Sequence, residues 1–186
     1  MMPVGAFADD ETTTATTITP ADVANAVDGY YLIQESGVYN LSGGNYTGGY
    51  IVITDSAKNV IINLQGDITV QETALDNDRK PYAFILVKNR SLTTINGNGH
   101  TVKAETDLNL IMSDWGGTIT LNGGTYKAPV YTHPVLAQKN GGTLSLHGTT
   151  VAVTGTEDSG RCIRNDESTL EICEGTVLNN GLAGDH

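Results

Sequence analysis

The sequence predicts an all-β protein, a right-handed parallel β-helix of about five to six coils behind a short N-terminal capping helix. The first observation is composition: the 186 residues include 22 glycines, and only 17% are charged. Such a composition favours short strands joined by tight turns over a helical bundle. The second observation is that similar segments recur along the chain, and the third is that one short helix signal precedes them. The right hand follows from the general prevalence of that winding.

Each recurring segment has alternating apolar residues, a polar residue, a nearby glycine and then a second short strand. Taking the last apolar residue before the turn as an anchor gives spacings of 31, 26, 25 and 26 residues. The anchors are Leu64, Ile95, Leu121, Leu146 and Ile172, with a fainter copy at Leu41. A further strand lies about ten residues before each anchor, at 50–53, 84–87, 108–112, 135–137 and 162–163. This regularity favours stacked coils over a β-sandwich.

If the coils stack, equivalent residues form columns. The anchors and the residues two positions before them are predicted to face the core, namely Ile62, Thr93, Ile119, Leu144 and Leu170. The residues between these two columns, Asn63, Thr94, Thr120, Ser145 and Glu171, are predicted to face solvent. The residues just after the anchors, Gln65, Asn96, Asn122, His147 and Cys173, are predicted to begin the turns. Apolar and polar residues thus alternate with a period of two, as in a half-buried strand.

The N-terminus divides into three predicted segments. Residues 1–8 end in Ala6-Phe7-Ala8, and we interpret them as the remnant of a secretory signal peptide, with an ordinary N-terminal stub as the alternative. Residues 9–19 are a Thr-rich linker. Thr19 and Pro20 then begin a helix that Gly29 ends. The β-helix domain spans 20–186, and because its last coil lacks a capping helix, we expect it either to continue beyond 186 or to pair with a neighbour, and we favour continuation.

The charge excludes several classes of partner. Ten basic and 21 acidic residues give a net charge of −11. Binding to a nucleic acid backbone needs a positive surface, so no nucleic acid partner is expected. No run of eighteen apolar residues exists to insert into a membrane.

Several segments resemble a known family. "INGNGHTVKA", "GGTITLNGGTYKA" and "NGGTLSLHGTTVAVTG" resemble coils of pectate-lyase-like β-helix domains in exported proteins of Gram-positive gut bacteria. The segment 36–70 is similar to the opening of clostridial β-helical carbohydrate-binding domains. The resemblance covers roughly 29–180 through fold-defining residues. It implies the fold, a secreted or cell-surface location, and carbohydrate binding as one function the scaffold carries.

Enzymes on this scaffold need a constellation of residues that the sequence lacks. Hydrolases need paired carboxylates, and lyases need carboxylates that hold Ca²⁺ beside a basic residue. The solvent-facing column holds a single acid, Glu171. The cluster Arg161, Arg164, Asp166 and Glu167 is interpreted as solvated turn residues. We therefore expect no catalytic residues, with a polysaccharide lyase or hydrolase fragment kept as an alternative.

Candidate ligand-binding residues are Trp115, Tyr131 and His133. Trp115 stands in a turn where the repeat spacing places Asn89, Asn140 and Asp166 in neighbouring coils. An indole at a polar position is expected to be partly exposed, where it can stack on a sugar ring; folding back over Gly116-Gly117 is the alternative. Tyr131 and His133 lie in a proline-stiffened loop that could share an edge with Trp115, whereas Tyr126 is expected in the core.

Two further features concern metals and thiols. Asp76 and Asp78, in the extra residues of the longest repeat, offer oxygen ligands of the kind Ca²⁺ takes, although a solvated turn is the alternative. No other cofactor is indicated. Cys162 and Cys173 are expected to be free thiols rather than a disulfide.

These observations together predict an exported cell-surface β-helix module for adhesion or glycan binding. The alternative is a structural stalk within a larger surface protein. The expected partner is a polysaccharide or a host or cell-surface glycan.

Overall fold

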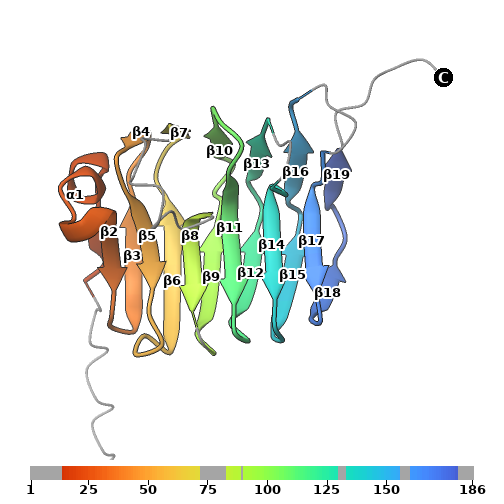
Figure 1. Cartoon of the computed structure of the whole chain (residues 1–186), viewed down its shortest axis with the longest axis horizontal. Helices are drawn as coiled ribbons and strands as arrows, with labels where there is room; N and C mark the ends of the chain where they lie inside the picture. The colour runs from red at the N-terminus through yellow and green to blue at the C-terminus, as the bar shows by residue number, and fades with distance from the viewer. Residues whose placement is uncertain (1–13, 72–82, 89, 130–132, 156–159, 180–186) are drawn as a thin grey trace, which may run out of the picture.

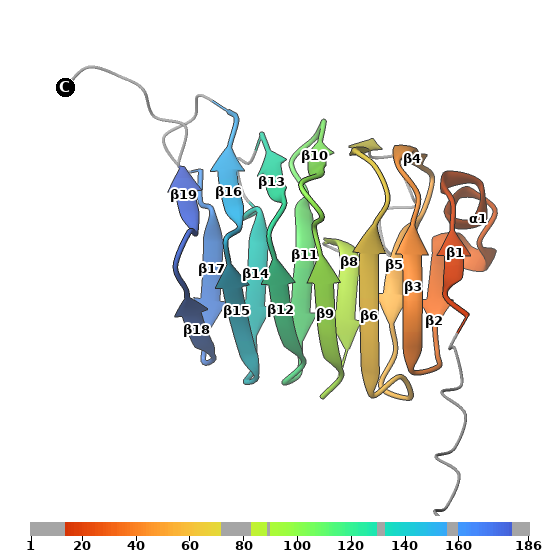
Figure 2. The same cartoon turned by 180° about the vertical axis from the view of Figure 1, so that it is seen from behind.

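The computed structural model is a single stack of coils, and each complete coil contributes one strand to each of three parallel sheets (Figures 1 and 2). It describes residues 14–71, 83–88, 90–129, 133–155 and 160–179. Every strand pair between coils is parallel, and the two shorter sheets have six strands each within the described residues. The predicted all-β parallel coil and its number of turns are therefore confirmed. Its right hand stays a prediction.

We call the three sheets A, B and C. Within each coil the chain passes first through sheet B, then through sheet A and then through sheet C. Sheet A contains β1 (Thr16–Ile18), β3 (Gly37–Leu41), β6 (Asn59–Leu64), β9 (Leu92–Asn96), β12 (Thr118–Asn122), β15 (Thr143–His147) and β18 (Thr169–Ile172). Sheet B contains β2 (Tyr30–Ile33), β5 (Tyr50–Ile53), β8 (Ala83–Lys88), β11 (Asn109–Asp114), β14 (Leu136–Lys139) and β17 (Ile163–Asp166). Sheet C contains β4 (Gly44–Thr47), β7 (Ile68–Gln71), β10 (Thr101–Ala104), β13 (Thr125–Ala128), β16 (Thr150–Val153) and β19 (Val177–Asn179).

The predicted capping helix forms, but it is short. Helix α1 (Pro20–Ala24) has Pro20 in its first turn, and Thr19 and Asp22 form a reciprocal capping box. A 3₁₀ turn, Val27–Gly29, follows it, so the helix ends before Gly29. Helix α1 packs against β4 at the N-terminal end of sheet C, where Val23 is fully buried. The helix thus covers the edge that β4 would otherwise present to solvent.

The Thr-rich segment differs from its predicted role as a linker. Its residues 16–18 form strand β1, which pairs with β3, and Ile18 is fully buried in the core. The strand has two exposed threonines followed by a buried isoleucine, so Ile18 is the apolar contact that it makes with the core. Residues 1–13, which include the expected signal remnant, lie outside the described residues.

The core columns of sheet A stack as predicted, with one error of register at the second coil. Ile95, Leu121, Leu146 and Ile172 stack in successive coils, but the residue that pairs with Ile95 is Ile62 rather than Leu64. Leu64 instead pairs with Leu41 on its other side. Val60 therefore pairs with Thr93 in the second core column, where we predicted Ile62.

The correct register creates an asparagine ladder on sheet A. The side-chain amide of Asn63 donates to Asn40 Oδ1 at 3.4 Å, that of Asn96 to Asn63 at 2.8 Å, and that of Asn122 to Asn96 at 3.0 Å. Asn63, predicted to face solvent between two core columns, belongs to this ladder, and Gln65 does not take the predicted place beside Asn96. Each step joins one coil to the next through polar side chains at a sheet corner.

The buried tyrosines allow a matched test of hydrogen bonding in the core. Tyr126 is 1% exposed, as predicted, and its hydroxyl has no hydrogen-bond partner, whereas the Tyr46 hydroxyl donates to Ser42 O at 2.8 Å. Burial raises the pKa of Tyr126. We expect Tyr126→Phe to raise the free energy of unfolding by about 1 kcal/mol, because it removes an unsatisfied polar group.

Tyr46→Phe is the control, and it should lower the same free energy by about 1 kcal/mol because it removes a satisfied bond. Urea unfolding of both variants measures the difference. Equal effects of the two substitutions would contradict this account.

Candidate functional site

Trp115 stands on the turn after β11 with 66% of its surface exposed, which agrees with the expected partial exposure. Its backbone is left-handed, with φ at +61°. The strand register places Asn140 and Glu167 in the equivalent turns, and both share the left-handed conformation, with φ at +57° and +51°. Glu167, not Asp166, is therefore the counterpart of Trp115 in the last described coil.

Tryptophan is an unusual residue for this backbone conformation. Asparagine adopts left-handed φ readily, whereas a bulky side chain there carries a penalty of about 1 kcal/mol or more. The fold therefore accepts both strain and an exposed indole at Trp115. Residues that break local rules in this way concentrate at binding and catalytic sites.

A buried polar stack beneath these turns holds them in place. The Gln138 amide is fully buried and donates to Gly117 O at 2.8 Å and to Gly141 O at 2.7 Å. Ser113, which pairs with Gln138 in the register, also donates to Gly117 O, at 2.9 Å. In the next coil, Asn165 donates to Ser168 O at 2.7 Å. Two successive turns share one side chain, so Trp115 projects from a rigid platform. Gln138 is not among the predicted site residues, although it is a polar residue in an apolar strand.

His133 is held by an acid from the preceding coil. The His133 backbone N–H donates to Asp107 Oδ1 at 3.2 Å, and Nδ1 lies 3.3 Å from Asp107 Oδ2. Asp107 is not among the predicted site residues, although it precedes His133 by 26 residues, the spacing of the repeat. That spacing is the signal that could have found the pair.

The structure does not bring Trp115 and His133 together. Residues 133–135 lie beside the start of β11, because Leu110 N donates to Val135 O, whereas Trp115 follows the end of that strand. The strand rise separates the two ends by roughly 20 Å. The predicted shared edge is therefore wrong for this pair. Tyr131 and the candidate calcium ligands Asp76 and Asp78 lie outside the described residues, so their roles stay predictions.

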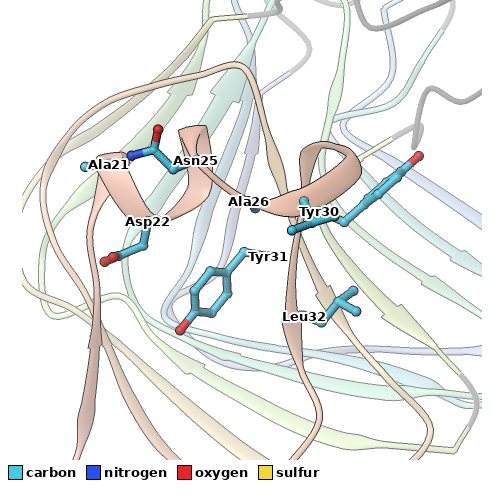
Figure 3. Close-up of a pocket in the computed structure, with 8 residues that line it drawn as sticks. Ala21, Asp22, Asn25, Ala26, Tyr30, Tyr31 and Leu32 are labelled. Atoms are coloured by element: carbon cyan, nitrogen blue, oxygen red, sulfur yellow. The ribbon is translucent and has the colours of Figure 1, made fainter.

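A shallow hollow of about 510 Å³ lies between α1 and β2 (Figure 3). The ring of Tyr31 lies beneath the helix, with Asp22 and Asn25 above it and Leu32 beside it. Leu32 and Val27 are 50% and 81% exposed, so the rim is apolar and solvated. This hollow has no signal in the sequence, because it forms only where the helix meets the first strand of sheet B.

The charged group in this hollow, the Asp22 carboxylate, already caps helix α1. The Asp22 carboxylate accepts hydrogen bonds from the Thr19 hydroxyl and backbone, and the side-chain bond is the larger cause that lowers its pKa. Partial burial, and then the Asp22 charge, raise the pKa of Tyr31. Asp22 thus serves as a capping group, and Asn25, Tyr30 and Tyr31 supply the other polar side chains of the hollow.

Cys162 and Cys173 form no disulfide, as expected. Cys162 is buried, and its thiol donates to Val151 O at 3.4 Å and to Asn179 O at 3.2 Å; burial raises its pKa. Its neighbour Ile163, rather than Cys162, pairs with Leu136 in the register. Cys173 stacks on His147 as predicted, with Sγ 3.8 Å from Nε2.

On sheet A, the column that we predicted to face solvent contains one carboxylate, that of Glu171. Glu171 accepts a hydrogen bond from Ser145 at 2.5 Å, so it is engaged by a neighbouring coil. Among the described residues, no three histidines, cysteines or acids gather as metal ligands. In the same residues, no helix is both long and apolar enough to cross a bilayer.

Among the described residues, Trp115 on its supported turn is thus the exposed aromatic side chain, and the hollow beneath α1 contains the half-buried ring of Tyr31. Comparison with known proteins adds no relative: no protein-family model, no curated protein and no solved structure matches the chain.

Proposed function

We propose that this chain is an exported cell-surface module that binds glycans without a catalytic reaction. The observation that carries the proposal is the exposed indole of Trp115, displayed in a strained left-handed turn above a buried hydrogen-bonded support. A flat aromatic face of this kind stacks on the apolar face of a pyranose ring. Export is supported by the Ala6-Phe7-Ala8 segment and the acidic composition.

Charge indicates which glycans the surface suits. A net charge of −11 repels uronate-rich and sulfated chains, so the proposed ligands are neutral polysaccharides or neutral surface glycans. The rigid stack of coils would hold the binding turn away from its point of attachment. Adhesion then follows when a cell displays many copies of the module.

Affinity electrophoresis in gels that contain xylan, β-glucan or galactomannan tests the proposal. At least one of these polysaccharides should retard the native chain. Trp115→Asn should weaken that binding roughly tenfold or more, since a central aromatic contact often dominates affinity. The same change should leave the free energy of unfolding equal or higher, because asparagine tolerates left-handed φ.

Two matched variants locate the contact. Leu92→Asn removes another exposed apolar side chain, 53% exposed on β9, and should leave binding unchanged. Tyr31→Ala tests the hollow under α1. Absence of retardation in all three polysaccharides would contradict glycan binding and favour a structural stalk. Loss of binding in Tyr31→Ala with full binding in Trp115→Asn would contradict the Trp115 site.

A further inference from the structure

The two ends of the described stack differ in how they cover the core. Helix α1 closes the edge of sheet C at the N-terminal end (Figure 1). At the other end, β17, β18 and β19 are the outermost strands of their sheets and pair on one side only within the described residues. Open strand edges readily pair with the edge of another chain.

The last described coil also leaves apolar side chains in solvent. Ile172, Val177 and Leu178 are 52%, 52% and 43% exposed, whereas their counterparts one coil earlier, Leu146, Thr150 and Val151, are buried or half-buried. A hollow of about 570 Å³ opens onto the core between Ile163, Leu170 and Leu178. These side chains and this hollow leave the core partly open to solvent at the last described coil.

We propose that two copies of this chain join through this coil, edge to edge, in a two-fold symmetric dimer. A head-to-tail chain of copies would place this coil against α1 of the next copy, and α1 blocks the edge of sheet C there. Contact between the last described coils of two copies avoids the helix and closes after two copies. The two-fold axis makes the new strand pairing antiparallel.

The charges on β17 match this arrangement. The side chains of Arg164 and Asp166 are 46% and 39% exposed, and because the two residues are two positions apart on β17 they lie on the same face of the strand. They form an ion pair, with Arg164 Nε 2.7 Å from Asp166 Oδ2. A two-fold axis through Asn165 places Arg164 of each copy opposite Asp166 of the other. The edge is therefore complementary to itself, and the two ion pairs join into one network of four charges.

Sedimentation velocity of the whole chain between about 1 and 100 µM tests the proposal, because the dimer fraction changes across this range when the Kd is micromolar. We expect a concentration-dependent species of twice the chain mass. Arg164→Asp places like charges opposite each other and should weaken the dimer at least tenfold. The double variant Arg164→Asp, Asp166→Arg restores the pairing and should restore the dimer.

Two further variants separate this interface from other causes. Lys88→Asp changes an exposed charge in the same column of sheet B, three coils away, and should leave the dimer intact. Leu178→Asp should give a monomer whose circular dichroism matches the native chain. A native chain that stays monomeric, forms larger polymers, or dimerises equally well in Arg164→Asp and Leu178→Asp would overturn the proposal. None of these outcomes depends on glycan binding.

Discussion

Gly142→Ala is expected to lower the free energy of unfolding by about 3 kcal/mol or more, which is large for a single methyl group. Gly142 has φ at +80°, a conformation that L-residues rarely adopt. A Cβ at this position would also stand 2.2 Å from Gly117 O and 2.8 Å from Gln138 Nε2. The methyl group therefore adds a steric clash to the backbone strain, and the clash falls on the polar stack that supports the Trp115 turn.

Gly148→Ala is the matched control for this prediction. Gly148 also has a left-handed backbone, with φ at +57°, but a Cβ there would meet open space. Its expected loss is about 1–2 kcal/mol, from backbone strain alone. Urea or thermal unfolding of the two variants measures both effects. Similar losses for the two glycines would show that close packing between coils is unimportant at Gly142.

Leu121→Ala is expected to lower the free energy of unfolding by about 3 kcal/mol, within the range seen for fully buried leucines. Leu121 is fully buried and stacks between Ile95 and Leu146 in neighbouring coils. The substitution leaves a cavity that the rigid strands on either side cannot close. It removes a contact in the middle of the stack, so both halves of the core lose a neighbour.

The neighbouring Thr120 provides the comparison. It points to the outer face of the same strand, and Thr120→Val keeps its shape and β-branching. This change should alter the free energy of unfolding by no more than about 0.5 kcal/mol. Chemical denaturation monitored by circular dichroism checks both variants. A Thr120→Val effect as large as that of Leu121→Ala would contradict the assignment of the two faces.

The register error at the second coil shows where sequence reasoning reaches its limit. A shift by two residues keeps every apolar side chain on the same face, so the alternation reads equally well with Leu64 or Ile62 beside Ile95. The observed separation is that of Ile62 and Ile95, two residues longer than the one predicted. The asparagine column distinguishes the two registers, because only the observed one brings Asn63 within 2.8 Å of Asn96.

The candidate site was only partly predictable for a related reason. The exposure of Trp115 follows from a bulky aromatic residue in a column of polar turn residues, which the repeat itself reveals. Its left-handed backbone and its support from Gln138 depend on a contact between two coils. The separation of Trp115 from His133 depends on which end of β11 each residue lies beside, and the hollow at Tyr31 requires the packing of α1.

The sequence by itself determined the parallel coil, its number of turns, the capping helix and the inward apolar columns, because these depend on local periodicity and on a repeat that fills the core only when stacked. Tertiary structure alone decided the register at the second coil, the use of residues 16–18 as a strand, the partners of His133 and Trp115, and the exposure of the last described coil. These features rest on contacts between residues more than twenty positions apart. Period-two patterning allows several such pairings, and only packing and hydrogen bonding between coils select one of them.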